Sequence, residues 1–286
     1  MAVHFLSTLA EITLTMSVVI LLLLALGPLL ARWYAPQWRY WAWLAVAVRL
    51  LLPVNFSLPQ APVALESPID RVIYTVPGPE PSPAPAVSPQ APTGQEAANL
   101  PAAVPSRPDT QPTVRSLTLS QALFWTWLSG MAAVLLWHLV CWLRFQSYLH
   151  RWAVPADPPV FLPALLGELG LSAPVRLLSC PGLKGPMMTG LCQPTILLPQ
   201  EGTDQSALWF ILRHELTHFK RRDIPYKALL LCAGVVHWFN PLVWLMLRAA
   251  EGDLERSCDA DVVRGLPQED RARYGQVILN AVRGRG

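Results

Sequence analysis

Two histidines and a glutamate in the segment RHELTH, residues 213 to 218, have the types and spacing of a metal-binding hydrolytic site. On a helix, positions four apart lie on one face, so His214 and His218 can reach the same ion. Glu215 lies beside that face and can accept a proton from a water molecule whose pKa a zinc ion lowers to about 7. The alternative is a chance pattern on a buried helix. Against it, apolar side chains at helical spacing predict a helix from Asp204 to Arg222. These side chains are Trp209, Leu212, Leu216 and Phe219.

A catalytic zinc ion needs a third protein ligand, and the acidic segment from Glu251 to Asp261 offers several carboxylates. Such segments are often solvated charged faces. Glu255 and Asp259, however, are four residues apart and share a helix face. One can bind the metal while the other orients a ligating histidine through its second ring nitrogen. We therefore predict Glu255 as the third ligand and Asp259 as the orienting residue. Cys258 is a further candidate ligand, although packing beneath the site is the favoured interpretation.

Two more features are candidates for the site. The segment from Gly190 to Leu198 resembles a strand beside the cleft to which an extended peptide could be added. Its candidate substrate-binding residues are Gly190, Thr195, Ile196 and Leu197, and an ordinary core strand is an equally good interpretation. His237 has the chemistry to stabilise an oxyanion, but a hydrogen-bonded core histidine is the favoured interpretation for a lone histidine in an apolar helix.

The composition places much of the chain in a lipid bilayer. Of its 286 residues, 52% are hydrophobic and only 14% are charged, whereas soluble domains carry about 25% charged residues. The formal net charge of +3 is too small to indicate direct nucleic-acid binding. We expect two membrane spans within residues 1–54 and a third at residues 119–145, formed by the apolar runs from Ile12 to Ala31, Tyr40 to Val54 and Leu119 to Phe145.

A signal peptide is the alternative for the first run. A signal peptide would begin with a basic leader, and no Lys or Arg precedes Arg32. Around the start of the second run, Trp38, Trp41 and Trp43 are typical of the membrane interface.

Residues 55–118 are expected to form an extracytoplasmic loop. Its Pro-, Ala- and Ser-rich part, Pro77 to Pro112, predicts an extended linker. The loop contains three basic residues, whereas the chain after the third span is rich in them, including the cluster Lys220 to Arg222. The positive-inside rule then predicts a plasma (inner) membrane protein with its N-terminus outside and residues 146–286 in the cytoplasm. The five cysteines contain no CxxC pair and fit free thiols in that compartment.

Residues 146–286 indicate a small mixed domain with a short helix at Pro163 to Leu171 and strands at Val175 to Cys180 and Thr195 to Leu198. The apolar stretch from Tyr226 to Leu247 is long enough to cross the membrane. A full crossing would separate Glu255 from His214, and Asn240-Pro241 interrupts the stretch midway. We therefore predict an apolar helical hairpin at residues 224–250 that dips into the membrane or packs on the domain.

Several stretches carry a family resemblance beyond the HExxH motif with its distant ExxxD, which is similar to the gluzincin pattern. RHELTHFKRRD, HWFNPLVW, LERSCDADVV and GLCQPTILLP resemble the BlaR/MecR-type membrane antirepressor peptidases of β-lactam sensing. The resemblance implies a multi-pass α-helical membrane protein with a cytoplasmic α+β gluzincin-like zinc metallopeptidase domain. It also implies that His214, His218 and Glu255 bind Zn²⁺ and that Glu215 is the general base.

The same resemblance implies a protein substrate, a DNA-bound transcriptional repressor or another regulator, cleaved in response to a signal. The sequence ends at Gly286 without the penicillin-binding domain of those sensors, so we expect either another signal input or a truncated form. Two other functions remain open: an HtpX-like quality-control protease of membrane proteins and a non-catalytic signalling scaffold, which would have no need of Glu215. The sequence leaves open whether the protein forms a homodimer in the membrane.

Overall fold

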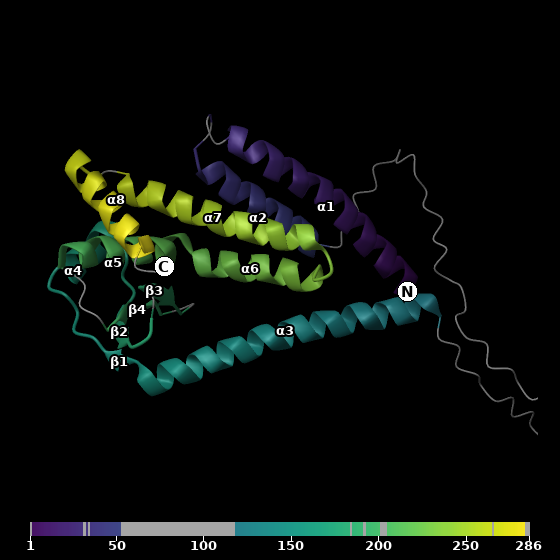
Figure 1. Ribbon diagram of the computed structural model, residues 1–286, viewed down its shortest axis with the longest axis horizontal. Coiled ribbons are helices and arrows are strands. Elements are labelled where there is room, and N and C mark those ends of the chain that lie inside the picture. Colours follow the sequence, from purple (N-terminus) through teal and green to yellow (C-terminus); the bar gives the residue numbers. More distant parts are fainter. Residues whose placement is uncertain are drawn as a thin grey trace, which may run out of the picture.

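The computed structural model describes residues 2–30, 33, 35–52, 118–183, 185–190, 193–200, 205–264 and 266–283. The predicted linker from Pro77 to Pro112 lies outside these residues, as does nearly all of the expected loop at 55–118. Four helices pack side by side in a bundle (Figure 1), namely α1 (Ala2–Leu30), α2 (Gln37–Leu51), α6 (Asp223–Val236) and α7 (Pro241–Val263).

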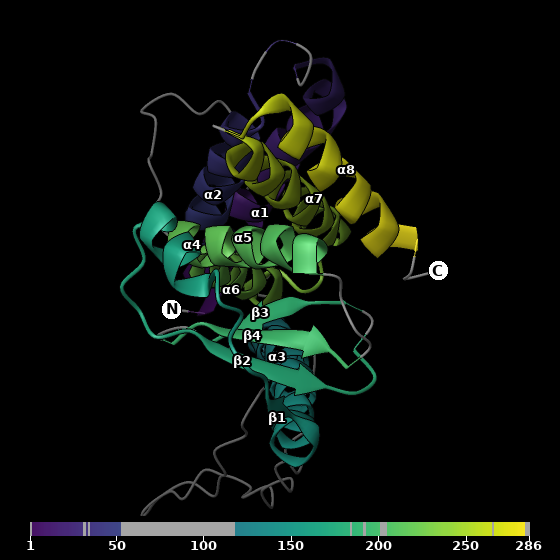
Figure 2. The ribbon, with the colours of Figure 1, turned by 90° about the vertical axis from the view of Figure 1, so that its left-hand side faces the viewer.

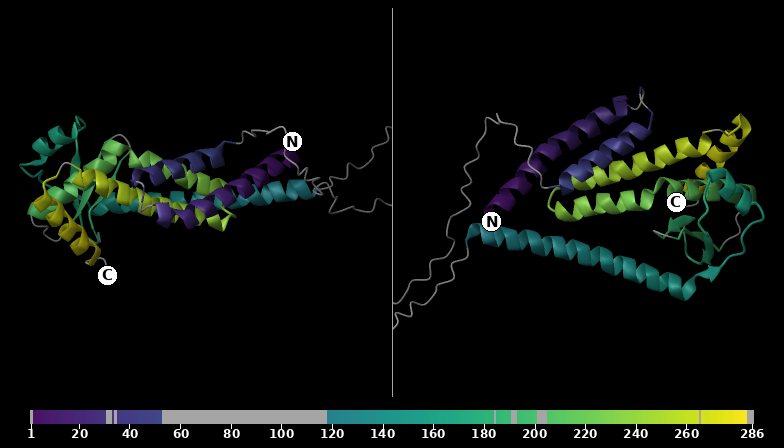
Figure 3. Two further views of the ribbon diagram at one scale, coloured as in Figure 1. Left: turned by 90° about the horizontal axis from the view of Figure 1, so that it is seen from above. Right: turned by 180° about the vertical axis from the view of Figure 1, so that it is seen from behind.

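The third expected span belongs to a longer helix, α3 (Leu119–Trp152), which runs along one side of the molecule apart from much of the bundle (Figure 3). Of the described helices, Val3–Gly27 of α1 and all of α3 are long and apolar enough to cross a membrane, judged by length and composition. The run from Tyr40 to Val54 does not meet this test. Its helix, α2, ends at Leu51 after 15 residues, which is about 22 Å against the roughly 30 Å of the hydrocarbon core.

The packing of α2 within the bundle explains why its sequence resembles a membrane span. Its apolar side chains pack against α6 and α7, and Trp43, Val46, Ala47 and Leu50 are buried there. The prediction that Trp43 marks a membrane interface is therefore wrong, because only 1% of this residue is exposed, whereas Trp41 is 62% exposed.

A four-stranded sheet follows α3 and has the order β1-β2-β4-β3. The pair β2–β4 is parallel, and the pairs β1–β2 and β3–β4 are antiparallel. A short helix, α4 (Leu162–Leu169), covers it together with α5 (Gln205–Arg221), and the core between them contains Leu165, Ile196, Leu212 and Leu216. The strands are β1 (Val154–Pro155), β2 (Arg176–Cys180), β3 (Met187–Thr189) and β4 (Thr195–Pro199).

This order corrects the prediction of an open edge at Thr195, Ile196 and Leu197. They lie in β4, which has β2 on one side and β3 on the other, and Ile196 and Leu197 are fully buried. The strand next to α5 is β3, and its side away from β4 has no strand partner among the described residues.

The last four helices carry the candidate residues. The motif helix α5 (Gln205–Arg221) lies between the sheet and α7 (Figure 2), and α8 (Gln268–Arg283) packs against it. Arg222 has a left-handed backbone (φ 60°) that ends α5, so α6 begins at Asp223. At the far end of α6 the chain turns at Asn240, whose side-chain oxygen accepts a hydrogen bond from the Leu242 amide, 3.0 Å away, and starts α7. The two helices pack together and return the chain to α5.

Candidate metal centre

The motif helix α5 places the two imidazoles on one face, and α7 brings a carboxylate to them. The Nε2 atoms of His214 and His218 are 3.1 Å apart, and Oε2 of Glu255 lies 3.6 Å from the first and 3.2 Å from the second. Ligand atoms held about 2.0–2.1 Å from a tetrahedral ion stand about 3.3–3.4 Å from one another. The three atoms therefore form a triangle of the right size for one zinc ion, and the Glu255 side chain, 46% exposed, leaves a side open.

The second ring nitrogen of His218 is held by a buried carboxylate. Nδ1 of His218 lies 2.7 Å from Oδ2 of Asp223, and the Asp223 side chain is only 2% exposed. Arg221 approaches the same oxygen with its Nε at 3.4 Å and pairs with Asp261 at 2.9 Å. This chain of contacts fixes the orientation of the His218 ring and the nitrogen that faces Glu255.

His214 has a corresponding but more open arrangement. Its Nδ1 lies 2.8 Å from the hydroxyl of Tyr274 in α8 and 3.3 Å from Oδ1 of Asp259 in α7, while the Tyr274 hydroxyl donates to the same Asp259 oxygen. The Asp259 side chain is 40% exposed. The structure thus places Asp259 beside the second ring nitrogen of a candidate ligand, His214, as the sequence predicted for an orienting residue.

The electrostatics of the three converging groups favour a positive charge between them. Burial lowers the pKa of both imidazoles, but hydrogen bonds to carboxylates outweigh it. Asp259 and Glu255 raise the pKa of His214 to about 9, and Asp223 is the largest cause that raises the pKa of His218, to about 12. Burial raises the pKa of Glu255, but the two histidines hold it well below its usual range. A divalent cation would supply the charge that these protons supply.

Glu215 lies in the wall of a cavity of about 250 Å³ that opens over the triangle. Burial raises the pKa of its carboxyl group, and the neighbouring histidines lower it to a lesser degree. Lys227 lies in the same wall, with its Nζ 3.4 Å from Oε1 of Glu255. A carboxylate beside such an opening has the position of a general base.

Cys258 is the second candidate for the third ligand. Its Sγ and one nitrogen from each of His214 and His218 lie within 4.8 Å of one another. The thiol is fully buried, burial raises its pKa, and it donates weakly to the His214 carbonyl oxygen 3.8 Å away. The Glu255 carboxylate is ionised and stands at ligand spacing from both rings, whereas burial disfavours the thiolate that a metal requires.

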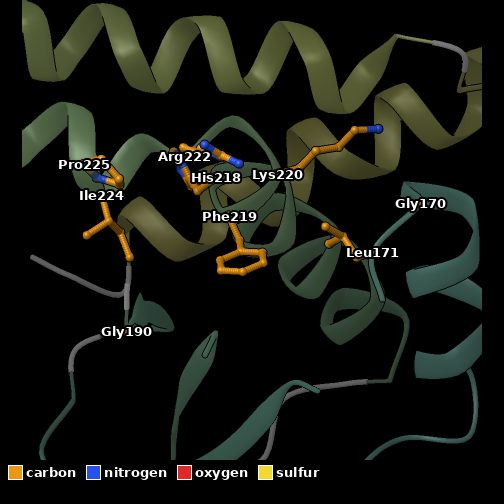
Figure 4. A pocket seen from close by; sticks show the side chains of 9 residues that line it. All are labelled: Gly170, Leu171, Gly190, His218, Phe219, Lys220, Arg222, Ile224 and Pro225. Atoms are coloured by element: carbon orange, nitrogen blue, oxygen red, sulfur yellow. The ribbon is translucent and has the colours of Figure 1, made fainter. Parts of the chain in front are cut away.

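A second cavity of about 510 Å³ adjoins the first, since His218 and Ile224 line both. Figure 4 shows Phe219 and Ile224 directed from the helices toward the side where Gly190 lies. Of the four predicted substrate-binding residues, only Gly190 reaches a described cavity wall. Its φ of +95° and the Gln193 carbonyl oxygen, 2.2 Å from where a Cβ would stand, explain why a glycine occupies the position.

Several residues of the site were not predicted from the sequence. Asp223 had a usable signal, since it is an acid at the first position of the helix that follows the motif. Tyr274 had none, because it reaches His214 from 60 residues away. Met187 and Met188 of β3 line the smaller cavity, but a three-residue strand leaves little periodicity to recognise.

His237 lies at the far end of the α6–α7 hairpin, about 20 Å along α7 from Glu255. Its Nδ1 is 2.9 Å from the Thr13 hydroxyl and its Nε2 3.1 Å from the Leu50 carbonyl oxygen. It is fully buried, as a hydrogen-bonded core histidine would be, and it lies away from the cavity.

Comparison with known families decides the relationship of the whole chain. The sequence profile described as "BlaR1 peptidase M56" matches residues 7–286. The chain belongs to this family. Among its relatives, the M56 chain is 31% identical over 168 residues to "Regulatory protein BlaR1" of Bacillus licheniformis, a match that covers 57% of this chain and 28% of that protein.

It is also 31% identical over 100 residues to "Methicillin resistance mecR1 protein" of Staphylococcus aureus, a match that covers 34% of this chain and 17% of that one. The resemblance to BlaR/MecR-type proteins is therefore confirmed, and the chain spans less than a third of the length of either relative.

Proposed function

We propose that this M56 peptidase is a membrane-anchored zinc metalloendopeptidase in which His214, His218 and Glu255 bind the metal. The observation that carries the proposal is the triangle of three ligand atoms, 3.1, 3.2 and 3.6 Å apart, contributed by two helices. Each imidazole also has a carboxylate on its other nitrogen, and such partners usually accompany histidines that bind metals.

Zinc, when bound, would act as a Lewis acid and lower the pKa of water enough for deprotonation near neutral pH. In this proposal Glu215 accepts that proton and returns it to the amine that leaves when the peptide bond breaks. Asp223, Asp259 and Tyr274 orient the two imidazoles. The neighbouring cavities, which meet at His218 and Ile224, would accept the side chains on either side of the bond to be cleaved.

The proposed substrate is a cytoplasmic protein, a transcriptional repressor or another regulator, cleaved in response to a signal. The support comes from the relatives, which are named as a regulatory protein and as a methicillin-resistance protein. A cleavage screen separates the alternatives: one regulator cut on stimulation supports the proposal, many damaged membrane proteins support quality control, and no cleavage at all supports a scaffold.

In the proposed topology the N-terminus and the start of α3 lie outside and the zinc site lies in the cytoplasm. The chain then returns to the outside through α2, which is packed against α6 and α7 within the bundle. The concentration of basic residues after α3 supports this orientation. Single cysteines introduced at Thr118 and at His150, near the two ends of α3, test it after the native cysteines are replaced. A membrane-impermeant thiol reagent applied to intact cells is expected to label position 118 and spare position 150. The reverse pattern would contradict the topology.

Glu215→Gln tests the proposed chemistry. The variant is expected to bind zinc like the wild-type protein, because Glu215 is not a ligand, and to lose about 10²- to 10⁴-fold in kcat for want of a general base. His214→Ala is the matched comparison and is expected to lose the metal itself. Zinc content by mass spectrometry and peptide-cleavage rates measure both. Equal cleavage by Glu215→Gln and wild-type protein would end the assignment.

A further inference from the structure

A buried acidic residue of the bundle sits two positions from Glu255. Asp253 of α7 has a side chain that is 3% exposed, and one of its oxygens, Oδ2, accepts hydrogen bonds from two residues of α2. Arg39 donates through Nε at 2.9 Å, and Trp43 donates through Nε1 at 2.8 Å. The other oxygen pairs with Arg256 on α7 itself. A buried carboxylate needs such partners, since leaving it unpaired costs several kcal/mol.

Helical geometry connects this carboxylate to the candidate metal centre. Residues two apart on a helix point about 200° away from each other. Asp253 therefore faces α2, while Glu255 faces α5 and its histidines. A rotation of α7 that released Asp253 would swing Glu255 by the same angle, so the contact on one side of the helix fixes the direction of the ligand on the other.

The part of α2 that binds Asp253 is itself held by contacts with neighbouring helices. The Arg39 guanidinium lies against Gly27 of α1, where an added Cβ would approach it to 2.8 Å. At the next residue, the Tyr40 ring stacks on Tyr226 of α6 with centroids 4.2 Å apart, and the Tyr226 hydroxyl donates to the Tyr40 carbonyl oxygen at 3.2 Å. The first turns of α2 are thus packed between α1, α6 and α7.

The same part of α2 also touches the support of His218. The guanidinium carbon of Arg221 lies 5.0 Å from the centroid of the Tyr40 ring, and Gln37 donates to Asp261 at 3.3 Å. Arg221 in turn contacts Asp223, the partner of His218, and Asp261. One segment of α2 therefore contacts the supports of ligands from both α5 and α7.

We propose that Arg39 and Trp43 are positioning residues of the zinc site: by holding Asp253 they set the rotation of α7 that brings Glu255 to His214 and His218. The inference rests on the proposed function of those three residues. It makes α2 part of the peptidase machinery, although α2 ends at Leu51, more than 150 residues before the motif helix α5 begins at Gln205.

Arg39→Met and Arg256→Met in the full-length protein test the inference as a matched pair. Both remove the charge of an arginine bound to the same carboxylate, but only the first breaks the link to α2. Zinc affinity is measured by competition with a chelator, and metal-free unfolding temperature is measured in parallel. Arg39→Met is expected to weaken zinc binding about tenfold or more, as loss of an outer support does. Arg256→Met, which removes a pair whose arginine is 61% exposed, is expected to bind zinc within about twofold of wild type.

Trp43→Phe keeps an aromatic ring at this buried position but removes the indole N–H together with part of the ring system. It tests the inference even if Arg39→Met does not fold, and it is expected to weaken zinc binding severalfold. Arg39→Lys, which restores a positive charge, is expected to recover part of the affinity. Wild-type zinc affinity in both Arg39→Met and Trp43→Phe would overturn the inference. A lower metal-free unfolding temperature with unchanged zinc affinity would overturn it as well, since that is a structural role alone.

An equal loss of zinc affinity in Arg256→Met would also overturn it, because the effect would then come from the carboxylate and not from α2. Absence of zinc binding in the wild-type protein would refute the proposed function and this inference together. Wild-type binding that is unchanged in the α2 variants would refute this inference alone.

Discussion

Asp223→Asn isolates the support of one imidazole without removing a proposed ligand. The Asp223 carboxylate lies 2.7 Å from Nδ1 of His218, and both side chains are at most 9% exposed, so water cannot readily replace it. Asparagine keeps the shape and can still present a carbonyl oxygen to the ring. Its amide would then occupy the place of Oδ1, which is buried and has no hydrogen-bond partner among the described residues. The variant loses the charge and buries an unsatisfied donor.

The magnitude follows from the hydrogen bond that is weakened. A bond to a charged group contributes about 1.5–3 kcal/mol, and each 1.4 kcal/mol is a factor of ten. Zinc affinity is therefore expected to fall about 10- to 100-fold, the range seen when outer partners of metal-bound histidines are replaced. Chelator competition with a zinc-sensitive dye measures the dissociation constant, and kcat at saturating zinc is expected to change less.

Asp259→Asn is the matched comparison on His214. Its carboxylate is 40% exposed and shares the ring nitrogen with Tyr274, so water and the phenol can take over much of its role. We expect a loss of affinity of less than about tenfold. Zinc affinity that is unchanged in Asp223→Asn, or more strongly reduced in Asp259→Asn than in Asp223→Asn, would refute the reasoning from burial.

Two further predictions concern pH and the backbone. The raised pKa values of His214, about 9, and His218, about 12, mean that zinc displaces protons, so its apparent dissociation constant should fall about tenfold per pH unit for each proton displaced between pH 6 and 9. In the metal-free protein a higher pH has the opposite effect and lowers the stability of the fold. The stability contributed by protonated His214 is complete below its unfolded pKa of about 6.5 and is lost as pH rises through about 9. Thermal unfolding at several pH values measures this loss. A pH-independent zinc affinity would contradict the first statement. Gly190→Ala, at φ +95°, is expected to destabilise the protein by about 1–3 kcal/mol in denaturant unfolding, whereas Gly167→Ala in α4, with nothing within 4 Å, is expected to be neutral or stabilising. Equal effects of the two alanines would contradict the second.

The part of the site that could be predicted is the part that depends on local spacing. The histidine spacing and the apolar repeat predicted a helix at Asp204 to Arg222, and α5 spans Gln205–Arg221. The Asn240-Pro241 break predicted where the apolar stretch turns, because proline cannot continue a helix that must donate there, and α7 begins at Pro241. Shared helix faces singled out Glu255 and Asp259, which the fold brings to the two rings.

The part that could not be predicted depends on pairings between distant segments. Nothing in Thr195 to Leu198 indicates that β3 pairs on its outer side, so an interior strand resembled an edge. The apolar residues of α2 have the composition of a membrane span, but they are buried by α6 and α7 and their polar neighbours, Arg39 and Trp43, point to Asp253. Composition reports that a side chain is buried and does not report whether lipid or protein buries it.

X-ray absorption at the zinc edge of the purified, zinc-loaded protein tests the central claim most directly. Two imidazoles and a carboxylate are expected to give only nitrogen and oxygen scatterers at about 2.0–2.2 Å, with one oxygen fewer or replaced in Glu255→Ala and no change in Cys258→Ser. A sulfur scatterer at about 2.3 Å that disappears in Cys258→Ser, with Glu255→Ala unaltered, would show that Cys258 and not Glu255 completes the site.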